Sequence, residues 1–254
     1  MPSHDPTSGS RAHERVWLTA DVARTSRAVD APEAPRLDDE LEPVALAPDA
    51  LDRGATLEGV EIAGAELAGM RTGGLRLVGA RLVDVDLSGG RLTGLRLGDV
   101  AVERGNLANL AAPELSLRRV AVVGARLTGA QWTRGTIADA SFRDCRIDLA
   151  TFAGTTFERV RFEDCLLAQA DFREALLRSV RFERCDLTEA DLTGVRIDRC
   201  ELSGCTLDGL AGAERLRGAA MPWADVVGNA ALLAAALGIR VLDDDGPEPA
   251  RAAP

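Results

Sequence analysis

Apolar residues recur at every fifth position over most of the chain. From residue 57 to residue 207 this spacing gives 31 positions, and 29 of them hold Leu, Ile, Val, Phe or Trp; only Thr72 and Ala112 depart. A second series of small or apolar residues runs two positions earlier, from Ala55 to Cys205. None of the 22 acidic residues and 20 arginines between residues 55 and 207 falls on either series. Two of every five positions are therefore expected to be shielded from water.

A spacing of five fits neither a helix nor a long straight strand. In a helix each step of five would rotate the apolar side by about 140°, and in a strand successive steps would point to opposite faces. What fits is a short extended piece, in which two apolar residues two apart point the same way, followed by a bend. Glycine is frequent at the bend position, as a tight turn prefers. The spacing predicts a chain that turns a corner every five residues.

A second period of twenty residues sets the number of corners in one coil. The stretch "VRFEDC", residues 160–165, returns as "VRFERC" at residues 180–185. Twenty is four fives, so four corners of about 90° would bring the chain back above itself, with like residues stacked roughly 4.8 Å apart. The sequence therefore predicts a square solenoid of nearly eight coils. We number its four sides from the unit centred on Leu57.

The five-residue units resemble those of the pentapeptide-repeat family. In that family a small residue is followed by a second position that is often Asp or Asn, then by a central Leu or Phe and two variable positions. "ADFRE", residues 170–174, and "ADLTG", residues 190–194, match this pattern. The resemblance covers residues 55–207 and implies an all-β fold, a right-handed quadrilateral parallel β-helix of about eight coils. The chain departs from the family pattern at the second position, where Arg, Ser, Thr and Ala often stand in place of Asp or Asn.

The flanking segments lack the five-residue period. We expect a disordered acidic, proline-rich tail over residues 1–40, an N-terminal cap over 41–54, the β-helix over 55–210, a C-terminal cap over 211–242 and a disordered acidic tail over 243–254.

The C-terminal cap is expected to contain one helix and a short strand. "MPWADVVGNAALLAAALGIRVL" predicts a helix with Pro222 in its first turn and Gly238 at its end, then a strand over residues 239–242. Its apolar face would consist of Trp223, Val226, Ala230, Leu233 and Leu237. Such a helix would cover the apolar end of the last coil. Its alternative role is a homodimer interface.

The residues needed for catalysis are scarce. The only histidines, His4 and His13, lie in the tail, and the chain has neither Lys nor Tyr. Four cysteines spaced twenty apart, Cys145, Cys165, Cys185 and Cys205, would stack along one inner column, where they cannot converge tetrahedrally on a metal. Small buried thiols are the expected role. We therefore expect no catalytic residue, metal site or cofactor, and not an enzyme.

Composition limits the cellular location and the classes of partner that we expect. No apolar stretch is long enough to span a membrane, and the first residues do not have the pattern of a signal peptide. Five cysteines in such a chain favour reduced thiols and a cytoplasmic location. The net charge of -10 disfavours nucleic acid as a direct partner. No membrane contact is expected either.

Two functions remain open. The family resemblance implies DNA mimicry, in which an acidic rod occupies DNA gyrase and protects it from quinolone-type inhibitors. However, residues 55–207 have a net charge of only -2, and the four sides carry +3, -2, -3 and 0. We therefore rank first a non-catalytic interaction scaffold for an unidentified protein partner, with the gyrase-directed mimic as the alternative. The candidate surface for the mimic is Asp148, Asp186, Glu189 and Asp208 on the third side. The candidate surface for the scaffold is Arg76, Arg96, Arg178 and Arg196 on the first side.

Overall fold

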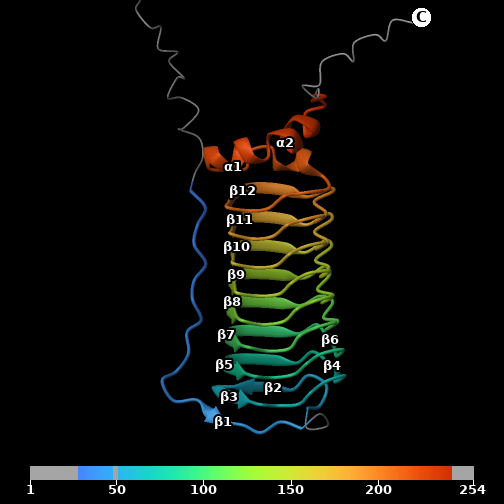
Figure 1. Ribbon diagram of the computed structural model, residues 1–254. Coiled ribbons are helices and arrows are strands. Elements are labelled where there is room, and N and C mark those ends of the chain that lie inside the picture. The colour runs from blue at the N-terminus through green and yellow to red at the C-terminus, as the bar shows by residue number, and fades with distance from the viewer. Residues whose placement is uncertain (1–27, 48–50, 242–254) are drawn as a thin grey trace, which may run out of the picture.

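The chain forms a four-sided coil that rises by one strand spacing per turn (Figure 1). The computed structural model describes residues 28–47 and 51–241. Most strands stack in one parallel sheet in the order β1-β3-β5-β7-β8-β9-β10-β11-β12, with β2 also paired to β5, while β4 and β6 form a second sheet. The strands are β1 (Glu42–Pro43), β2 (Thr56–Glu58), β3 (Val60–Ala63), β4 (Arg71–Gly73), β5 (Arg76–Val83), β6 (Arg91–Thr93), β7 (Arg96–Glu103), β8 (Ser116–Val123), β9 (Thr136–Arg143), β10 (Thr156–Glu163), β11 (Leu176–Glu183) and β12 (Arg196–Ser203).

The register between coils is the expected twenty residues. Phe162 pairs with Phe142 below it and with Phe182 above it. Their rings stack with centroids 5.0 and 5.1 Å apart. The long strands each span sides 1 and 2, and isolated bridges such as Asp171 with Asp191 join the coils elsewhere. The apolar series line the interior, which confirms the predicted parallel β-solenoid of about eight coils.

Every corner contains a residue with left-handed backbone conformation. Glycine was expected there, and Gly79 has φ 58°, yet Asp99 and Arg119 occupy the same corner in the next coils with φ 56° and 53°. A non-glycine residue in this conformation costs about 1–2 kcal/mol. A hydrogen bond to the next coil offsets part of that cost: the corner N–H of Asp164 donates to the carbonyl of Glu183 over 3.0 Å. The corners can therefore carry charged side chains.

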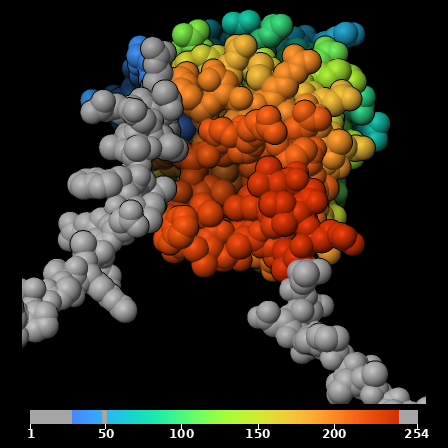
Figure 2. Space-filling view, turned by 90° about the horizontal axis from the view of Figure 1, so that it is seen from above, coloured from blue at the N-terminus to red at the C-terminus, as the bar shows by residue number. Residues whose placement is uncertain are grey.

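Both ends of the coil are covered. At the N-terminal end β1 pairs with β3, and Leu46 and Leu51 pack against the core. At the C-terminal end a 3-10 helix, η2 (Ala213–Leu216), is followed by two α-helices, α1 (Trp223–Gly228) and α2 (Ala230–Ala236). These helices cover the last coil, as the view along the rod shows (Figure 2).

The single C-terminal helix of the sequence prediction was wrong. It divides at Asn229, which follows Gly228, a poor helix former, and whose side-chain amide donates to the Asp225 carbonyl over 2.8 Å. Residues 239–241 form no strand, and Leu242 lies outside the described residues. Leu233 packs against the core, but Trp223 and Leu237 are 79% and 72% exposed. Only part of the predicted apolar face is therefore buried in this chain.

Residues 28–40 do not form the disordered tail that their composition suggested. They lie in extended conformation along the edge of the rod, from the level of β12 down to β1 (Figure 1). Polar contacts to the corners hold them there, and an apolar count cannot detect such contacts. We call residues 28–40 the strap. The rest of the predicted N-terminal tail, residues 1–27, and the C-terminal tail over 243–254 lie outside the described residues.

Candidate functional site

The corner between sides 1 and 2 carries alternating charges, one side chain per coil. We call this row of residues the corner column: Asp99, Arg119, Asp139, Arg159, Ser179 and Arg199. Arg119 donates two hydrogen bonds to the Asp99 carboxylate, of 2.6 and 2.5 Å. Arg159 does the same to Asp139, over 2.6 and 2.9 Å. Each acid is thus paired with the arginine of the next coil.

The third pair of the corner column lacks its acid, and the strap supplies one. Ser179 stands where the pattern has Asp, so Arg199 has no carboxylate beneath it. The Asp30 carboxylate of the strap accepts hydrogen bonds from the Ser179 hydroxyl over 3.2 Å and from Arg199 Nη1 over 2.8 Å. The position therefore selects a carboxylate, because it presents one guanidinium and one hydroxyl donor.

The remaining acids of the corner column hold the main chain of the strap. The N–H of Glu33 donates to Asp139 over 3.4 Å, and the N–H of Arg36 donates to Asp99 over 3.1 Å. Three extended residues span about 10 Å, and two coils also span about 10 Å. The three-residue spacing of the strap contacts, at 30, 33 and 36, therefore matches the forty-residue spacing of Ser179, Asp139 and Asp99.

The strap also shields these ion pairs. Asp139 and Arg159 are 6% and 33% exposed at their side chains, whereas Asp84 and Arg104, a pair of the same geometry at the next corner, are 55% and 58% exposed. The hydrogen bonds from Arg159 lower the pKa of Asp139. Those from Arg119 lower the pKa of Asp99. Both carboxylates are ionised at neutral pH and can accept N–H groups.

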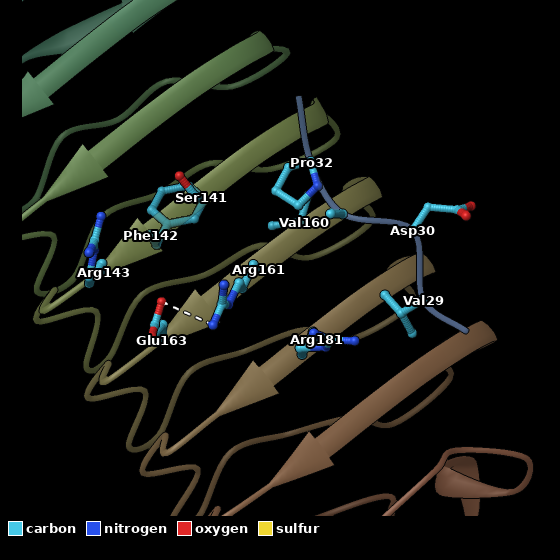
Figure 3. A pocket seen from close by; sticks show the side chains of 11 residues that line it. Val29, Asp30, Pro32, Ser141, Phe142, Arg143, Val160, Arg161, Glu163 and Arg181 are labelled. Atoms are coloured by element: carbon cyan, nitrogen blue, oxygen red, sulfur yellow. Dashed lines mark ion pairs between the residues drawn. The ribbon is translucent and has the colours of Figure 1, made fainter. Parts of the chain in front are cut away.

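A polar cavity of about 400 Å³ lies between the strap and side 2 (Figure 3). Asp30 and Pro32 border it on one side, and Ser141, Arg161 and Arg181 lie on adjacent strands of the opposite wall. The arginines are held by acids: Arg161 contacts Glu163 and Glu183 at 3.3 and 2.7 Å, and Arg181 contacts Glu201 at 2.6 Å. The cavity lies next to the corner column, so the two form one continuous depression beneath the strap. We call the corner column together with this cavity the corner groove.

The polar groups of the corner groove are hydrogen-bond acceptors and donors rather than proton-transfer groups. Its acids are paired with arginine, and their lowered pKa values do not suit a general acid. Within residues 28–47 and 51–241, no group of three or more His, Cys, Asp or Glu side chains is arranged to hold a metal ion. The groove offers acceptors for main-chain N–H groups and one site for a carboxylate. In this structure the strap, an extended segment of the same chain, makes these contacts.

Comparison with known proteins finds matches for the coil. A family model described as a pentapeptide repeat region matches residues 115–192 and 135–211. Residues 115–211 therefore belong to the pentapeptide-repeat family. No curated protein matches the chain.

Solved structures of pentapeptide-repeat proteins also match. One is HetL of the cyanobacterium Nostoc sp. strain PCC 7120, described as involved in heterocyst differentiation regulation; it is 19% identical, with 67% of this chain and 91% of that chain covered and a TM-score of 0.36. Another is a trypsin-treated variant of QnrB1, described as a plasmid-mediated fluoroquinolone resistance protein. It is 18% identical, with 75% and 91% covered and a TM-score of 0.36.

The acids predicted for the third side of this pentapeptide-repeat coil do not form a continuous row. Asp148 and Asp208 lie three coils apart, and Asp186 stacks on Leu166 in the neighbouring column. Further down that column, Arg126 pairs with Arg146. Among the described residues, no arginine comes within 4 Å of Asp148, Asp186, Glu189 or Asp208. The side is acidic near its C-terminal end but basic in its middle.

The arginines predicted for the first side fall into two separate places. Arg76 and Arg96 pair directly on β5 and β7, near the N-terminal end. Arg178 and Arg196 lie on β11 and β12, several coils away. All four are exposed. They do not meet in one patch, and none of them contacts the strap through a hydrogen bond in the described part of the chain.

The cysteines form part of the inner wall of the coil. Cys165 donates from Sγ to the carbonyls of Phe142 and Glu163, over 3.5 and 3.3 Å. All five cysteines are free thiols. Burial raises the pKa of the Cys200 thiol to about 12. The Cys200 thiol is therefore protonated at neutral pH. Cys145, Cys165, Cys185 and Cys200 are buried, and Cys205 is half-buried.

The corner groove was missed by the sequence prediction, although two patterns in the sequence point to it. Asp99, Arg119, Asp139 and Arg159 alternate in sign at intervals of twenty residues, which a search for apolar periods ignores. The strap reads "DAPEAP" from residue 30 to residue 35, a period of three. The strap has a period of three residues, and its contacts in the corner column have a period of forty. The two periods can be matched only when the rise of the coil is known.

Proposed function

We propose that this pentapeptide-repeat solenoid is a non-catalytic interaction module whose corner groove binds an extended polypeptide segment that carries one acidic residue. The observation that carries the proposal is the contact of Asp30 with Ser179 and Arg199. In that contact the groove already holds such a segment from its own chain. The partner would present the same chemistry.

The groove combines a general and a selective element. Asp99 and Asp139 accept main-chain N–H groups, which every residue except proline can offer. Arg199 and Ser179 require a carboxylate. Loss of one charge-assisted hydrogen bond of this kind is worth on the order of 1.5–3 kcal/mol, or roughly tenfold or more in affinity. The groove would thus accept many extended segments but discriminate at one position.

A peptide titration tests the proposal. A fluorescent peptide of residues 28–37 is added to the full chain bearing Asp30→Ala, whose own strap is weakened at its charged contact. We expect saturable binding by fluorescence anisotropy. A peptide with Asn at position 30 should bind at least about tenfold more weakly.

Variants of the protein provide the controls. Arg199→Gln, added to Asp30→Ala, should remove the preference for the acidic peptide. Arg196→Gln, an exposed arginine three residues away on the same strand, should leave the preference unchanged. Equal binding of the two peptides, or binding unaffected by Arg199→Gln, would show that the groove is not the binding site.

Gyrase-directed DNA mimicry is the second candidate. In its favour, Asp186, Glu189 and Asp208 lie near the C-terminal end of side 3, and among the described residues neither these acids nor Asp148 has an arginine partner. Against it, Arg126 and Arg146 interrupt the side, whereas a DNA duplex carries about two charges per 3.4 Å. A supercoiling assay with DNA gyrase, with and without a quinolone, tests this candidate. If micromolar protein neither inhibits gyrase nor protects it from the quinolone, this candidate is ruled out.

A further inference from the structure

The C-terminal tail repeats the sequence that the strap places in the corner groove. Residues 30–36 read "DAPEAPR", and residues 245–251 read "DGPEPAR". The two segments share Asp at the first position, Pro at the third, Glu at the fourth and Arg at the seventh. They also contain Ala and Pro at the fifth and sixth positions, in opposite order.

The shared positions are the ones that the groove contacts. The first position of the strap, Asp30, is bound by Ser179 and Arg199, and the fourth and seventh donate their N–H groups to Asp139 and Asp99. In the tail the first position is Asp245. The fourth and seventh are Glu248 and Arg251, which are not proline and so can donate in the same way.

The proline positions agree with the same mode of binding. In the strap, Val29, Pro32 and Pro35 are half-buried at a spacing of three, with exposed residues between them, and Leu37 is half-buried as well. Proline fixes φ near −65°, which favours the extended conformation of a groove-bound segment. The tail has Pro247 at the position of Pro32. Its second proline, Pro249, falls at the position of Ala34, whose N–H makes no hydrogen bond in the described structure.

The position of the last described residue favours a groove on another molecule. Both the start of the strap and the end of α2 lie at the C-terminal end of the rod, but the figures place them on opposite sides of that end (Figures 1 and 2). Asp245 follows Val241 by four residues, which span at most about 14 Å. The described part of the chain therefore ends across the rod from the start of its own strap.

We propose that residues 245–251 of one copy of this chain bind the corner groove of a second copy, in place of that copy's strap. The inference rests on the proposed function of the corner groove. Exchange of the two tails between two copies gives a closed, symmetric dimer. The strap is tethered to its own groove and therefore has the advantage of a high effective concentration. Weakening the strap should shift the balance towards the dimer.

The mass of the full chain in solution tests the inference. Multi-angle light scattering after size exclusion should give a monomer for the unsubstituted chain at low concentration and a dimer for Asp30→Ala at high concentration. Asp245→Asn, added to Asp30→Ala, should restore the monomer. Asp244→Asn, a neighbouring acid one position before the repeated segment, should not. Circular dichroism checks that each variant retains the fold.

Two results would contradict the proposed exchange of tails. A monomeric Asp30→Ala protein at high concentration, or a dimer that persists in Asp30→Ala with Asp245→Asn, overturns the inference. The second result would direct attention to the exposed apolar side chains of the cap, Trp223 and Leu237.

A peptide of residues 243–254 separates this inference from the proposed function. Binding of both the strap peptide and the tail peptide to Asp30→Ala, with both weakened when Arg199→Gln is added, supports the two together. Binding of the strap peptide alone overturns the tail inference and leaves the proposed function in place. If neither peptide binds, both are overturned.

Discussion

The ion pair between Asp139 and Arg159 should stabilise the coil far more than a pair of the same geometry at the next corner. The perturbation is Asp139→Asn. Asn keeps the size of the side chain and tolerates the left-handed backbone at this position, where φ is 53°. The substitution therefore removes charge without adding backbone strain.

The expected loss in the free energy of unfolding follows from the burial of the two side chains. Asp139 is 6% exposed and Arg159 is 33% exposed. Breaking a buried ion pair costs about 3–5 kcal/mol, and an exposed pair contributes about 0–1 kcal/mol. Because Arg159 is partly solvated and keeps its contact with Glu158, we expect a loss of about 2 kcal/mol in the free energy of unfolding, between those limits.

The assay is urea unfolding followed by circular dichroism. Asp84→Asn is the matched control, because Arg104 binds Asp84 over 2.8 and 2.9 Å with the same two-pronged geometry but both side chains are more than half exposed. The control should unfold at nearly the urea concentration of the unsubstituted protein. Equal shifts for the two substitutions would refute the reasoning that the strap shields the corner column.

Three further predictions concern pH, thiols and the core. The folded pKa values of Asp99 and Asp139 lie below their unfolded values, so their contribution to stability is present above about pH 4 and is lost as pH falls through the lower folded values; a melting temperature that already drops between about pH 7 and 5 would contradict this. The thiols, including Cys200, should react slowly with Ellman's reagent at pH 8 in the native protein and all five should react in guanidinium; rapid native reaction of several thiols would be inconsistent with an inner wall. Phe162→Ala should cost about 3–5 kcal/mol in urea unfolding, whereas Leu166→Ala, at 44% exposure, should have a small effect; similar losses would mean that the aromatic stack is not the core.

The coil could be predicted because its residues repeat with the period of the structure. Phe162 stacks on Phe142 since both obey the spacing of twenty, and no long-range information beyond that spacing was needed. The C-terminal helix was less predictable. Its apolar pattern continues through Gly228 and Asn229, but the weak helix propensity of these two residues divides it into α1 and α2.

The corner groove lay beyond the apolar pattern because its contacts are polar and join distant residues. Asp30 is 169 positions from Arg199, and Arg36 is 63 from Asp99. Nothing in the local sequence links them. Net charge per side also missed the groove, because it counts the acids and arginines of the corner column as cancelling. The two acids of the column balance two of its three arginines, which leaves Arg199 for the strap.

Hydrogen exchange in Ser179→Asp tests the central claim most directly. This substitution places an acid beneath Arg199, in a corner where φ is 53° and where Asp139 already adopts the same conformation two coils below. The new carboxylate should pair with Arg199 and repel Asp30. We predict faster amide exchange over residues 29–36, with unchanged exchange in β10 and β11. Unchanged protection of the strap in Ser179→Asp would contradict the claim that the missing acid of the corner column is the site that holds it.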